Sequence, residues 1–127
     1  MARIIIADDD PTTIFMVRAV LEDCGHIVGA LEDGIAVGDV ARLKSPDLLI
    51  LDCSMPGKTG LEALREIRAE LGKQLPIMML TGRTSRQDEA LAYQAGADDY
   101  FRKPIDPDEL VIRVEALLDP AMRRCRA

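Results

Sequence analysis

Short apolar runs alternate along the chain with longer segments in which apolar residues recur at three- or four-residue spacing. The short runs have the length and uniformity of buried strands, and the spacing between them is helical. The predicted strands are Ile4–Ala7, Ile27–Leu31, Leu48–Leu51, Ile77–Leu80 and Asp99–Arg102. The helical stripes are Ile14, Val17 and Leu21; Leu61, Leu64, Ile67 and Leu71; and Leu110, Val114, Leu117 and Leu118. A shorter helix is expected over about residues 34–43.

Residues that start and stop helices border these segments. Asp10-Pro11 and Asp106-Pro107 each read as an N-cap followed by proline at the first helical position. Thr59 with Glu62, and Asp106 with Glu109, have the spacing of a capping box. Three glycines are placed where a helix would end: Gly25, Gly72 and Gly96.

The regular alternation of strands and helices predicts a parallel sheet with helices on both faces. The first, third and fourth strands are uniformly apolar, which fits burial on both sides. The second is the weakest, with His26 beside it and Gly29 within it, and is expected at an edge. Right-handed crossovers then give the order 2-1-3-4-5. The predicted fold is a doubly wound, five-stranded, flavodoxin-like three-layer α/β/α domain over residues 1–119, with a short tail at 120–127.

Reactive polar residues follow four of the strands: Asp8-Asp9, Asp52, Thr81 and Lys103-Pro104. In a doubly wound sheet the residues just past the carboxyl ends of the strands converge on one edge, where such folds bind ligands. Neighbouring carboxylates repel and need a cation, and a few oxygen ligands suit Mg²⁺. An aspartate can attack a phosphoryl group, whose oxygens a lysine and a hydroxyl would hold. The pattern predicts phosphoryl-transfer chemistry.

Composition limits the function classes. The 127 residues fit one domain, and 16 basic against 22 acidic residues give a net charge of −6. This balance argues against direct binding to nucleic acid or to a membrane surface. No stretch is apolar enough to span a membrane, and no secretion leader is recognised. Cys24, Cys53 and Cys125 are odd in number and widely spaced, which disfavours a disulfide framework or zinc site and indicates a cytoplasmic protein. The lone His26 is assigned a structural role.

The four polar motifs, taken in order, resemble those of response-regulator receiver domains of two-component signalling. The resemblance covers about residues 3–118 and includes Asp52-Cys53-Ser54-Met55-Pro56-Gly57-Lys58-Thr59-Gly60, Thr81-Gly82 and Lys103-Pro104. It implies that Asp52 is the phosphoacceptor. It also implies a Mg²⁺ ion bound by Asp9 directly, by Asp8 directly or through water, by Asp52, and by the backbone carbonyl of Ser54.

The resemblance implies roles for the remaining motifs as well. Thr81 and Lys103 would hold the phosphoryl oxygens, Tyr100 would be an aromatic switch that follows Thr81, and the Lys103-Pro104 bond would be cis. Gly82 stands where alanine is more usual. Arg83 and Ser54 occupy positions that flank the phosphoryl group and would tune its lifetime.

The resemblance also implies partners. The phosphoryl donor would be a phosphohistidine on a sensor histidine kinase or a histidine phosphotransfer protein. An effector protein would read the face made by the fourth helix, fifth strand and fifth helix. The chain would be a signalling domain and not an enzyme, with Mg²⁺-dependent self-phosphorylation and self-dephosphorylation. It would be either a free-standing receiver or a piece of a longer regulator.

Two alternatives remain open. A phosphorylation-independent binding module could have the same fold with an idle site. Asp8-Asp9-Asp10-Pro11-Thr12 also fits the D-x-D-x-T pattern of haloacid-dehalogenase-like phosphatases, with Asp8 as nucleophile, but that reading leaves the segment from Asp52 to Gly60 unexplained. Gly57-Lys58-Thr59 is not a nucleotide P-loop, because that motif needs glycine at position 52.

Overall fold

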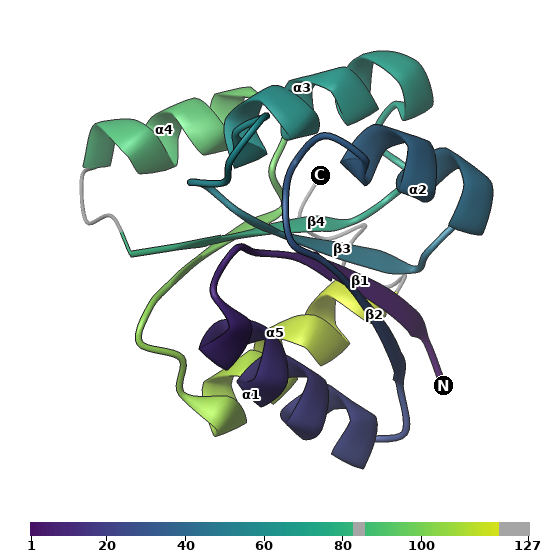
Figure 1. The fold of residues 1–127 in the computed structure, drawn as a ribbon. Helices are drawn as coiled ribbons and strands as arrows, with labels where there is room; N and C mark the ends of the chain where they lie inside the picture. The colour runs from purple at the N-terminus through teal and green to yellow at the C-terminus, as the bar shows by residue number, and fades with distance from the viewer. Residues whose placement is uncertain (83–85, 120–127) are drawn as a thin grey trace.

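The computed structural model describes residues 1–82 and 86–119, which form one five-stranded parallel sheet with helices on both faces (Figure 1). The strand order is β2-β1-β3-β4-β5, as predicted, and every pairing is parallel. The elements in chain order are β1 (Arg3–Ala7), α1 (Pro11–Asp23), β2 (Ile27–Leu31), α2 (Val37–Lys44), β3 (Leu48–Asp52), α3 (Gly60–Leu71), β4 (Ile77–Thr81), α4 (Arg86–Gln94), β5 (Asp99–Arg102) and α5 (Pro107–Leu118).

The sheet divides the hydrophobic core into two parts, because successive strand residues point to opposite faces. Ile4, Ile6 and their counterparts in the other strands pack with α1 and α5 on one face. Ile5, Ala7 and their counterparts pack with α2, α3 and α4 on the other. Figure 1 shows these two helical layers, with α1 and α5 below the sheet and the other three helices above it. Burial on both faces explains the uniformly apolar strands.

The predicted helix-start signals mostly act as expected. Asp10 accepts a hydrogen bond from the Thr12 N–H at the start of α1. Thr59 and Glu62 form the predicted reciprocal capping box at α3. Asp106 caps α5 through the Asp108 N–H.

Glu109 does not complete the capping box predicted with Asp106. Its carboxylate accepts hydrogen bonds from the Arg113 guanidinium instead. At the helix ends, Gly25, Gly72 and Gly96 all have the positive φ that favours glycine.

The second helix begins later than predicted. The sequence suggested residues 34–43, whereas α2 spans Val37–Lys44 and ends at Ser45, which has a φ of 46°. Gly34 belongs to the preceding loop because it packs on the loop that follows β3: a Cβ at Gly34 would lie 1.9 Å from the Lys58 carbonyl oxygen. This long-range contact has no signal in the local sequence pattern.

Among the described residues, no helix is long and apolar enough to cross a membrane. Cys24 and Cys53 are free thiols. The predicted tail at 120–127, with Cys125, and the flanking residue Arg83 lie outside the described residues.

Candidate functional site

Asp52 is the last residue of β3, and only 5% of its surface is exposed at the carboxyl edge of the sheet. Burial raises the pKa of its carboxyl to about 7; the negative charge of Asp8 adds to the rise and the positive charge of Lys103 opposes it. The Ser54 N–H donates to Asp52 Oδ1 over 3.4 Å, a long hydrogen bond. The ionised carboxylate therefore depends on nearby positive charge.

Asp8 and Asp9 follow β1 and bring two more carboxylates to this edge. Asp8 is fully buried and its Oδ1 accepts the Asp10 N–H at 2.9 Å, whereas Asp9 is exposed. One carboxylate oxygen from each of Asp8, Asp9 and Asp52 lies within 4.8 Å of the others. Three oxygen ligands, two of them buried, fit a small divalent cation such as Mg²⁺, which keeps several waters and needs few protein ligands.

Lys103 places an ammonium group between the two buried carboxylates. Its Nζ lies 3.1 Å from Asp8 Oδ2 and 3.7 Å from Asp52 Oδ2. Burial tends to lower the pKa of Lys103, but contact with Asp8 and the charges of both aspartates outweigh it and raise the pKa. The lysine therefore stays protonated. Its backbone N–H donates to the Thr81 carbonyl at 2.7 Å, and the Lys103-Pro104 bond is cis, as predicted.

Thr81 and Tyr100 lie on adjacent strands and on the same face of the sheet. Thr81 ends β4 with 1% exposure, and Tyr100 pairs with Met79, two residues earlier. Burial raises the pKa of the Tyr100 hydroxyl, with the Thr81 side chain acting in the opposite direction. Among the described residues the Tyr100 hydroxyl has no hydrogen-bond partner. The Tyr100 ring is buried beside Thr81, and its role as a switch stays a prediction.

The loop after β3 is held against the end of that strand. Gly60 starts α3 so close to β3 that a Cβ would lie 2.1 Å from the Asp52 carbonyl oxygen. The Gly60 N–H donates to the Cys53 carbonyl at 3.1 Å, and Lys58 forms an ion pair with Glu66 of α3. These contacts fix the direction of the backbone that carries Asp52.

Two ion pairs on the face of α4, β5 and α5 were not predicted. Asp99 opens β5 with 7% exposure and pairs with Arg113 of α5, with 3.0 Å between Asp99 Oδ1 and Arg113 Nη1. Arg102, at the other end of β5, pairs with Glu89 of α4 at 2.8 Å. A carboxylate in a buried strand needs a partner of opposite charge. The hydrophobic pattern of the sequence does not identify which arginine is that partner.

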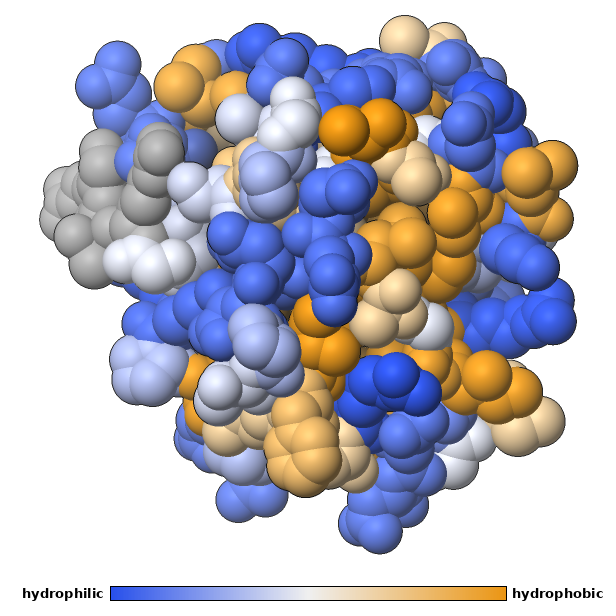
Figure 2. All heavy atoms as spheres, viewed as in Figure 1, coloured by the Kyte–Doolittle hydropathy of each residue, from blue (hydrophilic) through white to orange (hydrophobic). Residues whose placement is uncertain are grey.

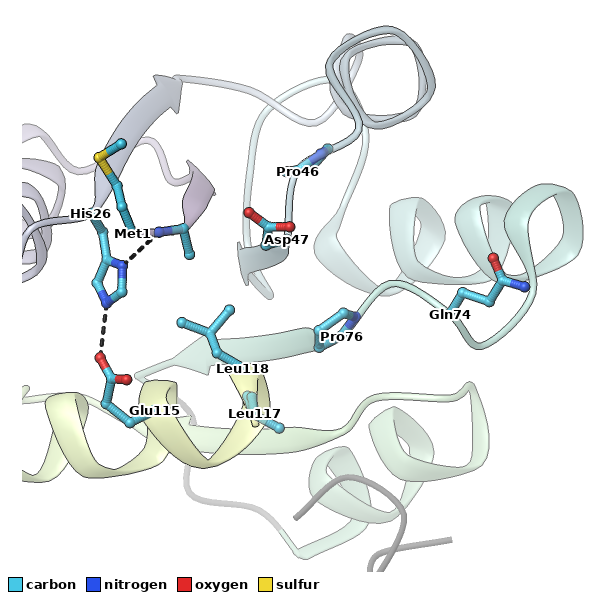
Figure 3. A pocket seen from close by; sticks show the side chains of 10 residues that line it. Met1, His26, Pro46, Asp47, Gln74, Pro76, Glu115, Leu117 and Leu118 are labelled. Atoms are coloured by element: carbon cyan, nitrogen blue, oxygen red, sulfur yellow. Dashed lines mark hydrogen bonds and ion pairs between the residues drawn. The ribbon is translucent and has the colours of Figure 1, made fainter. Parts of the chain in front are cut away.

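His26 lies at the opposite edge of the sheet, far along the strands from the carboxylates. Its Nδ1 accepts the Ala2 N–H at 3.1 Å and its Nε2 lies 2.8 Å from Glu115 Oε1 (Figure 3). These contacts join the start of β1 to α5 beside a cavity of about 500 Å³. They support the structural role predicted for this histidine.

Comparison with known proteins gives consistent matches. A family model described as "Response regulator receiver domain" matches residues 4–115. The DNA-binding response regulator MtrA of Mycolicibacterium smegmatis is 41% identical over 116 residues, covering 91% of this chain and 50% of MtrA. The response regulator MprA of Mycobacterium avium is 40% identical over 116 residues, with the same coverage of both chains. The chain therefore spans about half the length of these curated relatives.

Solved structures give the same result. The BeF3-activated receiver domain of Klebsiella pneumoniae RstA superposes with a TM-score of 0.86 at 31% identity, covering 91% of this chain and 97% of that one. The receiver domain of the sensor histidine kinase PA1611 from Pseudomonas aeruginosa has a TM-score of 0.84 at 32% identity, covering 92% and 97%. That structure holds a magnesium ion in its active site cleft. All four of these relatives are response regulators or receiver domains.

Proposed function

Because the chain belongs to the response regulator receiver domain family, we propose that it accepts a phosphoryl group on Asp52 and signals through the change that follows. The observation that carries this proposal is the position of Asp52: a buried carboxylate at the end of β3, with Lys103 Nζ at 3.7 Å and the acids Asp8 and Asp9 within 4.8 Å. The donor would be a phosphohistidine on a sensor histidine kinase or a histidine phosphotransfer protein.

Asp8, Asp9, Asp52 and the Ser54 backbone carbonyl would hold Mg²⁺, which when bound neutralises charge on the carboxylates and the phosphoryl oxygens. An Asp52 carboxylate oxygen attacks the phosphorus of the donor, the phosphorus–nitrogen bond breaks, and its electron pair returns to the imidazole. The Lys103 ammonium would hold one phosphoryl oxygen. Self-dephosphorylation would follow when water attacks the same phosphorus and releases phosphate from Asp52.

The Thr81 hydroxyl would hydrogen-bond another phosphoryl oxygen and draw the end of β4 inward. Tyr100, beside it on β5, would adjust with Thr81, and the face of α4, β5 and α5 would change shape. The two ion pairs on that face, Arg102 with Glu89 and Arg113 with Asp99, would be read by a protein effector. Such a response is a shift between two populations, so some of the active form would exist without phosphate.

The name of MtrA describes a DNA-binding protein twice as long as the matched region. The net charge of −6 gives this domain no basic surface of the kind that DNA requires. We therefore propose that the chain binds protein partners and makes no direct contact with nucleic acid or with a membrane. We also propose a cytoplasmic location.

The test is the intact mass of the protein after incubation with MgCl2 and acetyl phosphate. Wild type should gain one phosphoryl group, and Asp52→Asn should gain none. Asp23→Asn, an exposed acid at the end of α1, is the matched control and should be labelled like wild type.

Absence of an adduct on wild type, while a known receiver is labelled in parallel, would favour the phosphorylation-independent binding module. A partner would then bind wild type and Asp52→Ala equally well. An adduct that persists in Asp52→Asn and disappears in Asp8→Asn would favour the phosphatase chemistry.

A further inference from the structure

The edge strand β2 carries none of the usual protection against pairing with another strand. Its sequence, Ile-Val-Gly-Ala-Leu, contains no charge and no proline, and Ile27 is 52% exposed. Among the described residues, β1 is the only strand paired with it. Edge strands direct unpaired N–H and C=O groups outward, and natural proteins usually blunt them with lysine, proline or a bulge.

An apolar groove of about 290 Å³ lies along this strand on the side of α2. Its floor and walls include Ile5, Ile27, Leu31 and Val40. Gly29 leaves the middle of the groove open, since a Cβ there would meet only an Ile5 atom at 4.0 Å. Figure 2 shows an apolar patch to the right of centre, where α2 and β2 lie in Figure 1.

Charge is distributed unequally between the two ends of the strand. Arg3 and Lys44 line the groove near the start of β2, and Glu32 and Asp33 follow directly after its end. Within the described residues the side chains of Arg3, Lys44 and Glu32 form no ion pair. The exposed Asp47, whose carboxylate accepts the Arg3 N–H, also lies at the first end. With Arg3 and Lys44 that end is still net positive, and five uncharged residues separate it from the acidic end.

We propose that this edge binds a second copy of the chain, with the two β2 strands antiparallel about a two-fold axis near Gly29. An antiparallel arrangement places the basic end of each copy beside the acidic end of the other, so that the surface is self-complementary. The outward backbone groups pair across the axis, and the Ile27 side chain of each copy enters the groove of the other. Each copy carries a net charge of −6, and the contacts between opposite charges offset part of the repulsion between the copies.

A five-residue strand buries less surface than a standard interface, so the dimer is weak and its equilibrium should be measured up to about 1 mM protein. Sedimentation equilibrium gives the dissociation constant, and amide shifts locate the interface. Concentration-dependent shifts should appear at residues 27–31. Ile27→Asp should weaken the dimer at least about tenfold, because it removes the apolar side chain from the groove and places a carboxylate beside Glu32 and Asp33 of the other copy.

A charge exchange separates this interface from a general effect on the fold. Lys44→Glu and Glu32→Lys should each weaken the dimer about fivefold, because like charges then meet at both ends of the contact. The double variant restores the pairing between copies and should return to within about threefold of wild type. Ile112→Asp, at a 69% exposed isoleucine on α5, is the control and should leave the equilibrium unchanged. Circular dichroism verifies that every variant is folded.

The proposal is wrong if wild type stays monomeric up to about 1 mM protein. The groove would then be free or would bind something other than a second copy. The proposal is also wrong if Ile112→Asp dissociates a dimer that Ile27→Asp leaves intact. Asp52→Ala should dimerise like wild type without phosphodonor, so the dimer and the phosphorylation proposal fail or succeed separately.

Discussion

Replacing Asp52 with asparagine should stabilise the metal-free protein at pH 8, although it removes the proposed phosphoacceptor. Only 5% of the Asp52 surface is exposed, and its carboxyl lies near the negative Asp8 and accepts one long hydrogen bond from the Ser54 N–H. The folded chain therefore carries a carboxylate in a place that disfavours its charge. Asparagine has nearly the same shape and no charge.

The magnitude follows from the pKa of Asp52, which rises from 3.8 to about 7 on folding. About three pKa units correspond to at most about 4 kcal/mol. Solvent relaxation and the nearby opposite charges of Asp8 and Lys103 reduce this upper limit. We expect Asp52→Asn to raise the free energy of unfolding by about 1–2 kcal/mol. For a domain of this size the midpoint of thermal unfolding should rise by roughly 4–8 °C.

The sign depends on pH. Because the folded pKa lies above the unfolded value, the folded state retains a proton on Asp52 between about pH 4 and pH 7. The contribution of this carboxyl to the stability of the fold is fully present below about pH 4 and is lost as the pH rises to about 7. The advantage of Asp52→Asn should therefore be near zero at pH 4 and reach its full value above pH 7.

Urea unfolding at several pH values, in EDTA and in millimolar MgCl2, measures the effect. Mg²⁺ should stabilise wild type more than the variant, since binding to the folded state adds to stability. Asp23→Asn, on the exposed end of α1, should change stability by no more than about 0.5 kcal/mol at any pH. A variant that is less stable than wild type at pH 8 in EDTA would refute the reasoning.

Further substitutions test other contacts. Gly60→Ala should destabilise the fold by at least about 2 kcal/mol, because its Cβ would meet a carbonyl at 2.1 Å. Gly82→Ala should be nearly neutral, since no atom of the described residues lies within 4 Å of the added Cβ, and urea unfolding compares the two variants. Arg113→Met should lower the free energy of unfolding by about 1–3 kcal/mol, because the nearly buried Asp99 carboxylate loses its ion pair. Adding Asp99→Asn to the same chain should recover part of this loss.

The sequence was sufficient for the sheet order, the edge position of β2 and the meeting of Asp8, Asp52, Thr81 and Lys103. Each of these follows from rules that act over one element or between successive elements: apolar runs, capping residues and right-handed crossovers. The carboxyl ends of parallel strands must meet, so residues placed after those strands meet as well.

The features that sequence reasoning missed depend on contacts between distant segments. The start of α2 is displaced because Gly34 packs on the Lys58 carbonyl. The pairing of Asp99 with Arg113 depends on how far α5 lies from β5. Neither contact has a periodic or local signal, so neither could be predicted before the three-dimensional arrangement was known.

The division of the core by the sheet has a mechanical consequence for signalling. Tyr100 and Phe101 are adjacent in β5, yet Tyr100 packs with α2, α3 and α4, and Phe101 packs with α1 and α5. A movement of the tyrosine ring therefore disturbs the packing on one side only. The other side can remain a rigid support against which the moving side is displaced, so that a small local change is transmitted outward instead of being dissipated through the whole domain.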